Sequence, residues 1–243
     1  MKLEVCVADP RSLAAAIEGG AERIELCSAL ELGGLTPLPG LMALAAESGI
    51  ETYALIRPRS GDFVFGPDDE DAMLRDIDAV RAAGLSGVVL GASRPDGRLD
   101  DQLLARLLSH ASGLDSTLHR AIDLVPDFAE ATETAIALGF HRILTSGGAP
   151  TALEGLGQLA LAYATAAGRI KIMAGSGVRP DNVLELLAAV PVDEVHSSCA
   201  GEPVPSAEGA VRLGFAARTR RYSDAAVVRA FRETLAGYRT PAG

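Results

Sequence analysis

The sequence predicts an α/β fold, a single-domain TIM (β/α)8 barrel over residues 1–243, and three observations support this prediction. Short β-branched or apolar runs alternate with Ala/Leu-rich helical patterns about every 25 to 30 residues, as parallel strands with crossover helices require. Eight such pairs are present, which is the number that closes this barrel in a chain of this length. The first run leads into Asp9-Pro10-Arg11 rather than a GxGxxG turn, so the chain carries no nucleotide cofactor motif.

The predicted strands are short apolar runs, several of which carry polar residues at alternate positions. They span Leu3–Ala8, Arg23–Ser28, Glu51–Arg57, Gly87–Gly91, Ser116–Arg120, Arg142–Thr145, Ile170–Ala174 and Glu194–Ser197. Several of the predicted helices begin near a proline and end at a glycine, which is the usual asymmetry of helix ends. They span Pro10–Glu18, Pro39–Ser48, Glu70–Ala83, Asp101–Ala111, Pro126–Leu138, Ala152–Ala166, Arg179–Ala188 and Asp224–Tyr238. Two connections, Pro58–Asp69 and Cys199–Ser223, are long enough to act as functional lids.

The composition argues against several functional classes. With 48% hydrophobic and 22% charged residues, the chain is predicted to fold as a water-soluble globular domain. A net charge of −10 without any Lys/Arg-rich run opposes binding to nucleic acid. No stretch reaches the roughly 18 apolar residues of a membrane span, and Glu4 and Asp9 interrupt any signal peptide. The 3 cysteines form no disulfide framework, so we expect a cytoplasmic protein, with a homo-oligomer allowed but not required.

Charged and imidazole side chains gather at the ends of several predicted strands. Alternate residues of a barrel strand face inward, and barrel enzymes place their chemistry at the carboxyl ends of the strands. By this rule Glu25, His119, Asp123 and His196 are candidate general acids or bases. Taken singly, Glu25, Arg57 or His119 is as consistent with a structural ion pair inside the barrel as with a site. Their coincidence at one rim favours a site.

Candidate anion ligands follow other strands. Arg57 and Arg59 share one parity after the third strand and are predicted to clamp a carboxylate or phosphate by bidentate contacts. The turn Met173–Val178 is rich in glycine and precedes a predicted helix, so its amides are predicted to face an anion. Further candidate donors to the same substrate are Arg120, Thr145, Ser146, Gly175, Gly177 and Ser197. The alternative for the glycines is that they only turn the chain.

The cysteines form a second candidate site. If the barrel closes, Cys199, Cys6 and Cys27 come from the eighth, first and second strands, which are then neighbours. Thiolates are the soft ligands that Cu(I) prefers, so these three residues are candidate metal ligands. The alternative is that each is a small buried hydrophobic residue, because no CxxC or His-x₃-His pattern accompanies them.

Several segments, taken in order along the chain, resemble the CutC family, which is named for copper homeostasis. The matching segments are Arg23–Cys27, Gly33–Pro37, Ile56–Arg59 with Gly61–Phe63, His119–Ala121 with Asp123, Arg142–Gly147, Ile172–Gly175 with Gly177-Val178, and Glu194–Ser198. The resemblance implies a TIM-type barrel, a cytoplasmic protein, and a role in copper handling with Cu(I) bound through cysteines. Three positions depart from the family pattern, namely Leu32 in place of Glu, Ser60 in place of Gly, and Ile122 in place of Phe. None removes a charged group from the rim, but Leu32 weakens any mechanism that uses an acid there.

Two functions of different classes therefore remain open. The first is a copper homeostasis protein that binds Cu(I) through Cys6, Cys27 and Cys199. The second is an enzyme that acts on a small carboxylate or phosphate substrate by acid/base chemistry, because the family motifs are rich in Arg, His, Asp and Glu rather than in soft ligands. A third interpretation, an inert scaffold, predicts no ordered anion at the rim. The sequence leaves open whether the chain is an enzyme.

Overall fold

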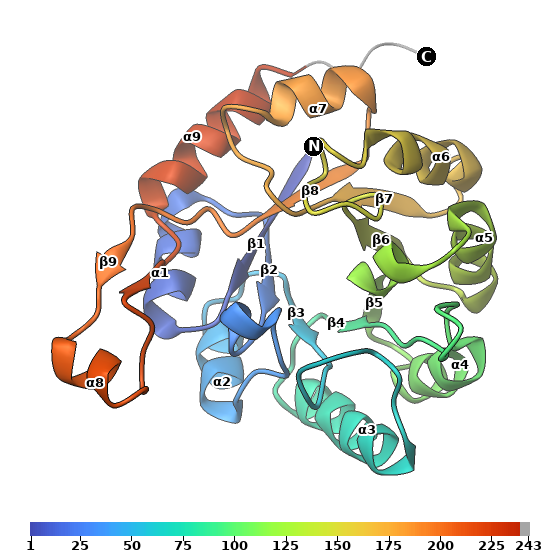
Figure 1. Cartoon of the computed structure of the whole chain (residues 1–243), viewed down its shortest axis with the longest axis horizontal. Coiled ribbons are helices and arrows are strands. Elements are labelled where there is room, and N and C mark those ends of the chain that lie inside the picture. Colours follow the sequence, from blue (N-terminus) through green and yellow to red (C-terminus); the bar gives the residue numbers. More distant parts are fainter. Residues whose placement is uncertain (239–243) are drawn as a thin grey trace.

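A computed structural model describes residues 1–238, and these residues form the predicted barrel (Figure 1). Eight parallel strands close in sequence order: Lys2–Val7 (β1), Arg23–Leu26 (β2), Thr52–Leu55 (β3), Gly87–Leu90 (β4), Asp115–Leu118 (β5), Arg142–Thr145 (β6), Lys171–Ala174 (β7) and Glu194–Ser197 (β8). β1 pairs with both β2 and β8, so the first and last strands of the barrel are neighbours. The prediction of a single-domain (β/α)8 barrel is confirmed.

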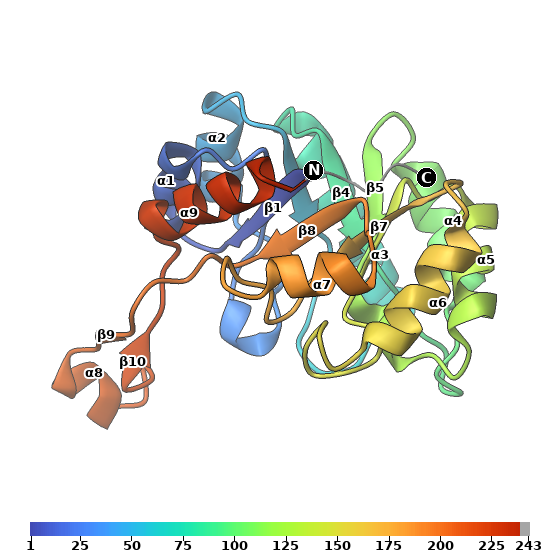
Figure 2. The same ribbon diagram turned by 90° about the horizontal axis from the view of Figure 1, so that it is seen from above.

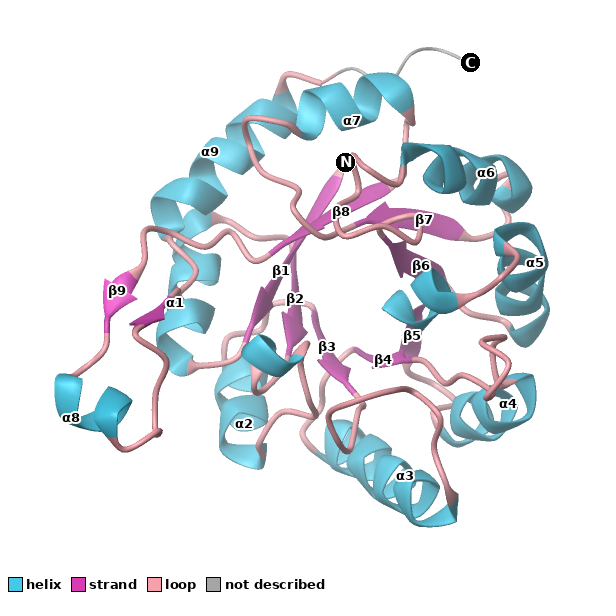
Figure 3. Cartoon of the chain, in the orientation of Figure 1, coloured by secondary structure: helices cyan, strands magenta, loops and turns pink. Residues whose placement is uncertain are grey.

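Helices form a ring outside the strands (Figure 3). They are Pro10–Gly19 (α1), Pro39–Glu47 (α2), Pro67–Ala82 (α3), Asp101–His110 (α4), Phe128–Leu138 (α5), Leu156–Ala166 (α6), Val183–Ala189 (α7) and Ala225–Ala236 (α9). Local chemistry sets their ends, as in α1, where the Asp9 side chain accepts from the Ser12 N–H, Pro10 begins the first turn and Gly20 takes a left-handed C-cap. Within residues 1–238, none of the helices has the length and apolar character needed to cross a bilayer.

Strand parity divides the side chains between two layers. Leu3, Val5 and Val7 of β1 are fully buried in the main apolar core, which lies between the strands and the helices. Glu4 and Cys6, on the opposite parity, enter the inside of the barrel among polar groups. This division matches the alternation that a barrel strand imposes. The carboxyl ends of the strands form one opening, which we call the mouth.

The connection from Cys199 to Ser223 carries structure that the sequence analysis did not predict. It contains the strands Val204–Pro205 (β9) and Thr219–Arg220 (β10), paired antiparallel, and the short helix Glu208–Arg212 (α8). Residues 201–222 project from the barrel as an arm (Figure 2). Two-residue strands and a five-residue helix are too short to give a periodic pattern, which explains the omission.

Several predicted boundaries were wrong. The fifth strand ends at Leu118, and His119 instead caps the 3-10 helix Arg120–Leu124 (η2). The third strand stops at Leu55 rather than Arg57. The helix predicted from Arg179 begins at Val183, because Asn182 accepts from the Arg179 N–H and holds the preceding residues in a turn. Side-chain hydrogen bonds of this kind compete with helix formation, which propensity alone does not reveal.

Candidate functional site at the barrel mouth

Three polar groups from three neighbouring strands meet inside the mouth. Cys6 of β1, Glu25 of β2 and His196 of β8 place a sulfur, a carboxylate oxygen and a ring nitrogen within 4.8 Å of one another. Strand register explains this convergence, because Cys6 lies opposite Glu25 and Glu4 lies opposite His196. All three residues are buried but keep between 6% and 8% of their surface exposed. We call Cys6, Glu25 and His196 the Cys6 cluster.

Glu4 fixes the orientation of His196. Its carboxylate lies 2.8 Å from Nδ1 of His196, and Glu4 is fully buried. The contact leaves Nε2 of His196 facing Glu25, whose carboxylate oxygen is 3.7 Å away. A carboxylate on one ring nitrogen selects the ring orientation in which the other nitrogen can act as a ligand or as an acid.

The charges around the cluster favour one distribution of protons. Burial alone raises the pKa of Glu4, but Arg23 and His196 outweigh burial and lower it to about 2. Burial raises the pKa of Glu25, and the negative charge of Glu4 adds to this effect although His196 opposes it. Burial alone lowers the pKa of His196, yet Cys6 and the two carboxylates hold it well above its ordinary value. The site therefore favours an ionised Glu4 and a protonated His196 beside a Glu25 that resists ionisation.

Paired charges fill the barrel interior next to the cluster. The Arg23 guanidinium donates to the carboxylates of Glu4 and Glu194, and Arg142 Nε lies 3.3 Å from Glu194. The ring of Tyr53 packs against both guanidinium groups, at 5.0 and 4.8 Å from its centroid. Buried charges are tolerated when they are paired in this way. This layer anchors Glu4, and through Glu4 it anchors His196.

A cavity of about 730 Å³ lies between the mouth and the arm. Cys6 lines it on the barrel side, and Arg220, Arg221 and Tyr222 line it on the arm side. The guanidinium of Arg11 stacks 4.3 Å from the centroid of Tyr222, which ties this part of the arm to the barrel. The volume lies in the range of about 300–1,000 Å³ that is usual for small-molecule sites. Cys6 is therefore reachable by a ligand larger than a metal ion.

The structure does not assemble the three cysteines into one site. Cys27 lies in a small apolar cluster with Tyr53, and burial raises the pKa of its thiol well above the ordinary value. Cys199 belongs to the main apolar core, and burial raises the pKa of its thiol to about 12. Within residues 1–238, only Cys6 joins a group of potential metal ligands. Cys27 keeps the inward parity of Glu25 but packs against Tyr53, Leu55 and Val89. Cys199 lies two residues beyond β8, where a left-handed φ of 45° turns it into the main core.

Arg57 and Arg59 both anchor the loop after β3. Arg57 donates from its two terminal nitrogens to three backbone carbonyls, those of Leu32, Gly34 and Gly61. Arg59 binds two carboxylates close in sequence, those of Asp62 and Asp69. To clamp an anion in the predicted bidentate way, the two arginines would have to give up these bonds to the loop. The one nitrogen of Arg57 without a partner in residues 1–238 is Nε.

Asp123 holds the loop after β6. Its carboxylate accepts from five groups: the Thr145 hydroxyl, the Ser146 N–H and hydroxyl, the Gly148 N–H and the Arg120 guanidinium. These bonds occupy both oxygens, so Asp123 has little capacity left to accept a proton from a substrate. The sequence predicted Asp123 as an acid or base, and Arg120, Thr145 and Ser146 as substrate ligands. The structure brings the four together as one internal network.

The glycine-rich turn after β7 owes its small residues to close packing. A Cβ on Gly175 would lie 3.3 Å from the Cβ of His196, and a Cβ on Gly177 would lie 2.9 Å from Thr151. Gly177 also has a φ of +70°, which favours glycine. Ser197 donates to a backbone carbonyl of this turn at 2.8 Å. These residues hold the turn against the Cys6 cluster.

His119 is neutral and acts as a helix cap. Its Nδ1 accepts from the Ala121 N–H at 3.0 Å, so the proton of the neutral ring is on Nε2. Burial lowers the pKa of His119 to about 3, and Arg57 contributes to the shift. A histidine in this state is a weak base but a good hydrogen-bond donor.

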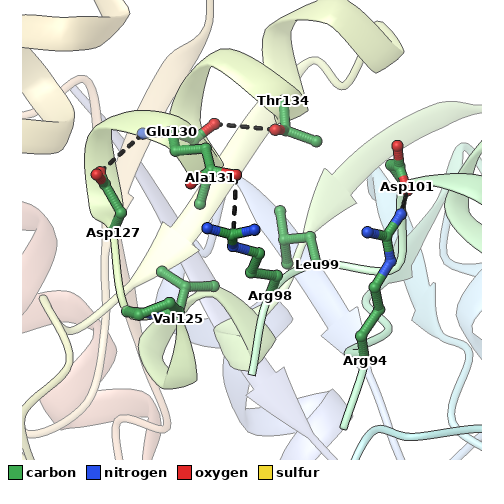
Figure 4. Close-up of a pocket in the computed structure, with 10 residues that line it drawn as sticks. Arg94, Arg98, Leu99, Asp101, Val125, Asp127, Glu130, Ala131 and Thr134 are labelled. Carbon is green, nitrogen blue, oxygen red and sulfur yellow. Dashed lines mark hydrogen bonds and ion pairs between the residues drawn. The ribbon is translucent and has the colours of Figure 1, made fainter. Parts of the chain in front are cut away.

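A second cavity, of about 90 Å³, lies beside the N-terminal end of α5 (Figure 4). Its arginines are already paired, Arg98 with Glu130 at 3.6 Å and Arg94 with Asp101. Asp127 caps α5 by accepting from the Glu130 N–H. This cavity offers no unpaired reactive group among the residues that line it, so the mouth remains the candidate site.

Sequence reasoning missed two parts of the site. It assigned no role in the site to Glu4, because the partner across the β1–β8 seam becomes known only on closure. It also passed over the basic residues of the arm, Arg220 and Arg221, which line the large cavity. The available signal was the short segment Arg218–Tyr222 after the eighth strand, whose 3 arginines contradict the expectation of no Lys/Arg-rich run.

Comparisons with known proteins agree on one family. The model of the CutC family matches residues 1–201. A CutC family protein of Rhizobium meliloti (strain 1021) is 56% identical over 235 residues, which cover 97% of this chain and 96% of the relative. One from Agrobacterium fabrum (strain C58 / ATCC 33970) is 55% identical over 239 residues, covering 98% of this chain and 95% of the relative.

Solved structures show the same fold. The crystal structure of CutC from Streptococcus agalactiae, described as a candidate copper homeostasis protein, aligns with a TM-score of 0.77 at 29% identity. The alignment covers 82% of this chain and 98% of that chain. A deoxyribose phosphate aldolase from Aeropyrum pernix aligns with a TM-score of 0.61 over 81% of this chain and 85% of its own. At 12% identity, that likeness concerns the fold alone.

Proposed function

Because the chain belongs to the CutC family, we propose that it acts in copper homeostasis by binding Cu(I), as cargo, at Cys6 and His196. The observation that supports this site is the approach of three potential ligand atoms, from Cys6, Glu25 and His196, to within 4.8 Å of one another. The three cysteines are free in the structure, and we place the activity in the cytoplasm, where reducing conditions preserve thiols.

The donor set fits copper in part. Thiolate is a soft ligand that suits Cu(I), and imidazole also suits copper, whereas a carboxylate is a harder ligand. Cys6 and His196 are therefore the proposed primary ligands, and Glu25 is a neighbour that helps to balance charge. The contact of Glu4 with Nδ1 leaves Nε2 of His196 for the metal, an arrangement common around bound metals. Cys27 and Cys199, which the sequence suggested as ligands, are not part of the proposed site.

Proton release follows from the same geometry. His196 is held in its protonated form by Cys6, Glu4 and Glu25, so Cu(I) binding at Nε2 must displace a proton. Once that proton leaves, the charge of the metal takes the place of the imidazolium between the carboxylates. Cu(I) therefore substitutes for a positive charge that the site already accommodates.

The test is an anaerobic Cu(I) titration in competition with a chromogenic chelator. We expect Cys6→Ser to weaken binding by more than about 100-fold, and Glu4→Gln, which removes only the supporting charge, to weaken it by about 10- to 100-fold. Cys199→Ser is the matched control, because Cys199 is equally buried but lies in the apolar core. Equal affinity of the parent and the Cys6→Ser variant would refute the site.

A second function is favoured by the cavity of about 730 Å³, which is larger than a metal ion requires. On this hypothesis the protein is an enzyme that transfers protons to or from a small carboxylate or phosphate substrate, with Glu25 and His196 as acid and base. The raised pKa values of both groups favour their protonated forms, which a general acid requires.

This second function can be tested before the substrate is identified. Mixtures of small phosphate and carboxylate metabolites are incubated with the protein in D₂O, and deuterium incorporation is followed by mass spectrometry. Deuterium exchange that is catalysed by the parent protein but not by the Glu25→Gln variant would support the enzyme hypothesis. Exchange that persists unchanged in Glu25→Gln would exclude Glu25 as the proton-transfer group.

A further inference from the structure

Arg57 is a buried cation with no counter-ion in the part of the chain that the structure describes. It is 5% exposed, and no carboxylate of residues 1–238 lies within 4.0 Å of its guanidinium. The other two arginines that are buried within residues 1–238, Arg23 and Arg142, each pair with carboxylates. Buried charges are normally paired, because an unpaired charge loses its hydration without compensation. Arg57 donates to three backbone carbonyls, but it lacks the carboxylate partner that the fold supplies to Arg23 and Arg142.

Two further buried donors lack partners beside it. Nε2 of His119 carries the ring proton, and neither this atom nor the Ser93 hydroxyl has a hydrogen-bond partner within residues 1–238. The same holds for Nε of Arg57. Buried polar groups without partners are rare, and each calls for a water or a ligand. All three belong to residues that contact Phe63, so they form one candidate group of donors.

Phe63 brings the three residues together and covers them. The guanidinium of Arg57 lies 4.9 Å from the centroid of the Phe63 ring, and the ring of His119 lies 4.8 Å from the same centroid. The Ser93 N–H donates to the Phe63 carbonyl at 2.8 Å. Phe63 itself is only half-buried, and Ser60–Asp62 before it are exposed. The Phe63 ring thus lies over Arg57 and His119 and is not part of the buried core.

The position of this group relates it to the mouth. Arg57, Ser93 and His119 follow β3, β4 and β5 at their carboxyl ends, whereas the Cys6 cluster belongs to β8, β1 and β2. A guanidinium, an imidazole N–H and a hydroxyl can all donate to oxygen, and a positive charge lies among them. The chemistry that complements such a surface is a small oxyanion.

We propose that Arg57, Ser93 and His119 form a binding site for one small oxyanion group, a carboxylate or a phosphate, which enters when the Phe63 ring swings aside. The site is independent of copper binding at Cys6. It supplies the proposed enzyme with a place for the anionic end of its substrate, on the opposite arc of strands from the Cys6 cluster.

The absence of tryptophan from the chain provides a direct assay. Phe63→Trp places a single fluorophore on the cover, and it is titrated with inorganic phosphate and, separately, with malonate. Phe65→Trp is the matched control, because Phe65 belongs to the same loop but lies over Arg59, whose charge is already paired. We expect a saturable change in emission for Phe63→Trp and none for Phe65→Trp. The anion that binds more tightly identifies the class of ligand.

Two substitutions then connect the signal to the donors. His119→Asn retains an acceptor for the Ala121 N–H but lacks Nε2, and Ser93→Ala removes only a hydroxyl. In the Phe63→Trp background each is expected to weaken anion binding by about 10-fold or more, as for a lost hydrogen bond to a charged group. Calorimetry on the unsubstituted chain confirms that binding does not depend on the tryptophan.

Three outcomes would overturn the proposal. One is the lack of saturable binding of either anion to the unsubstituted chain at millimolar concentration, in which case internal water satisfies the donors. Another is unchanged affinity in both His119→Asn and Ser93→Ala, which would place the anion elsewhere. A third is an equal response of the two tryptophan variants. Cu(I) titration of the same variants is expected to match the parent, so failure of this site and failure of the copper site are distinguishable.

Discussion

The carboxylate of Glu4 lies 2.8 Å from Nδ1 of His196, so one contact joins residues 192 positions apart and closes the barrel at the seam between β1 and β8. The same Glu4 binds Arg23, and His196 belongs to the Cys6 cluster. Barrel stability and site chemistry therefore share one buried carboxylate. A substitution of Arg23 is therefore expected to alter the chemistry of His196, and a substitution of His196 is expected to alter the stability of the barrel.

Arg23→Met is expected to destabilise the protein strongly. The substitution leaves Glu4 and Glu194 buried without their shared cation, and the loss of one partner from a buried pair costs about 3–5 kcal/mol of unfolding free energy. Urea denaturation measures the change. Arg75→Met is the control, because Arg75 pairs with Asp71 on an exposed helix face, where solvent screens the pair and little loss of stability is expected. Similar losses in the two variants would show that the interior network contributes little.

His119 is expected to make stability depend on pH in a defined window. Its pKa is about 3 in the folded protein, below the ordinary value of about 6.5 expected in the unfolded chain. Above the unfolded pKa both states are neutral, and there is no effect. As pH falls from about 6.5 towards 3, the unfolded state binds a proton that the folded state does not, so stability falls by up to about 1.4 kcal/mol per pH unit.

The measurement compares denaturation of the parent and His119→Asn across this window. Asparagine retains the cap on the Ala121 N–H and does not titrate. The difference between the two unfolding free energies should be constant above about pH 7, within error, and should shift in favour of the variant below about pH 6. A difference that stays constant down to about pH 4 would mean that His119 binds its proton normally in the folded state.

Gly91→Ala is expected to be destabilising because of a single neighbour. An added Cβ would lie 2.1 to 2.7 Å from three ring atoms of His119, so the imidazole must move off its cap. Overpacking of this kind costs about 1–3 kcal/mol, measured by thermal or chemical unfolding. Gly157→Ala is the control, because a Cβ there meets nothing within 4 Å and alanine favours the helix. A neutral Gly91→Ala would indicate that the His119 ring is loosely held.

Shortening the arm is expected to expose Cys6 without unfolding the barrel. Ala200 and Ser223 form a β-bridge, and the Gly201 N–H donates to the Tyr222 carbonyl at 3.0 Å, so the two ends of the arm are adjacent. Replacing residues 203–220 by two glycines should raise the rate of Cys6 modification by a thiol reagent several-fold, because the arm walls the cavity over Cys6. Circular dichroism checks that the barrel is retained.

The control for this experiment is Cys6→Ser in the shortened chain. Cys27 and Cys199 are 0% and 2% exposed in packed surroundings, so no fast-reacting thiol should remain. A fast phase that survives the substitution would place the reactive thiol elsewhere. An unchanged rate in the shortened chain would show that the arm does not restrict access to Cys6.

The barrel could be derived from local features of the sequence. Eight strand and helix patterns, their parity and their caps each depend on residues close together in the chain, so they are visible before folding is considered. Parity also pointed to Glu25 and His196, and the sequence marked these two residues and Cys6 as candidates for chemistry. The structure of the arm and the turn at Arg179–Asn182 were not predicted, because very short elements and side-chain capping leave no periodic signal in the sequence.

The grouping of these residues into sites emerged only on folding. Closure of β1 against β8 put His196 beside Glu4 and Cys6, while Cys27 and Cys199 became packed in two separate apolar clusters. The loop after β3 likewise directed Arg57 to backbone carbonyls and left its buried charge without a carboxylate in residues 1–238. The physical reason is that register and loop path depend on contacts between residues distant in sequence, and no local pattern encodes those contacts.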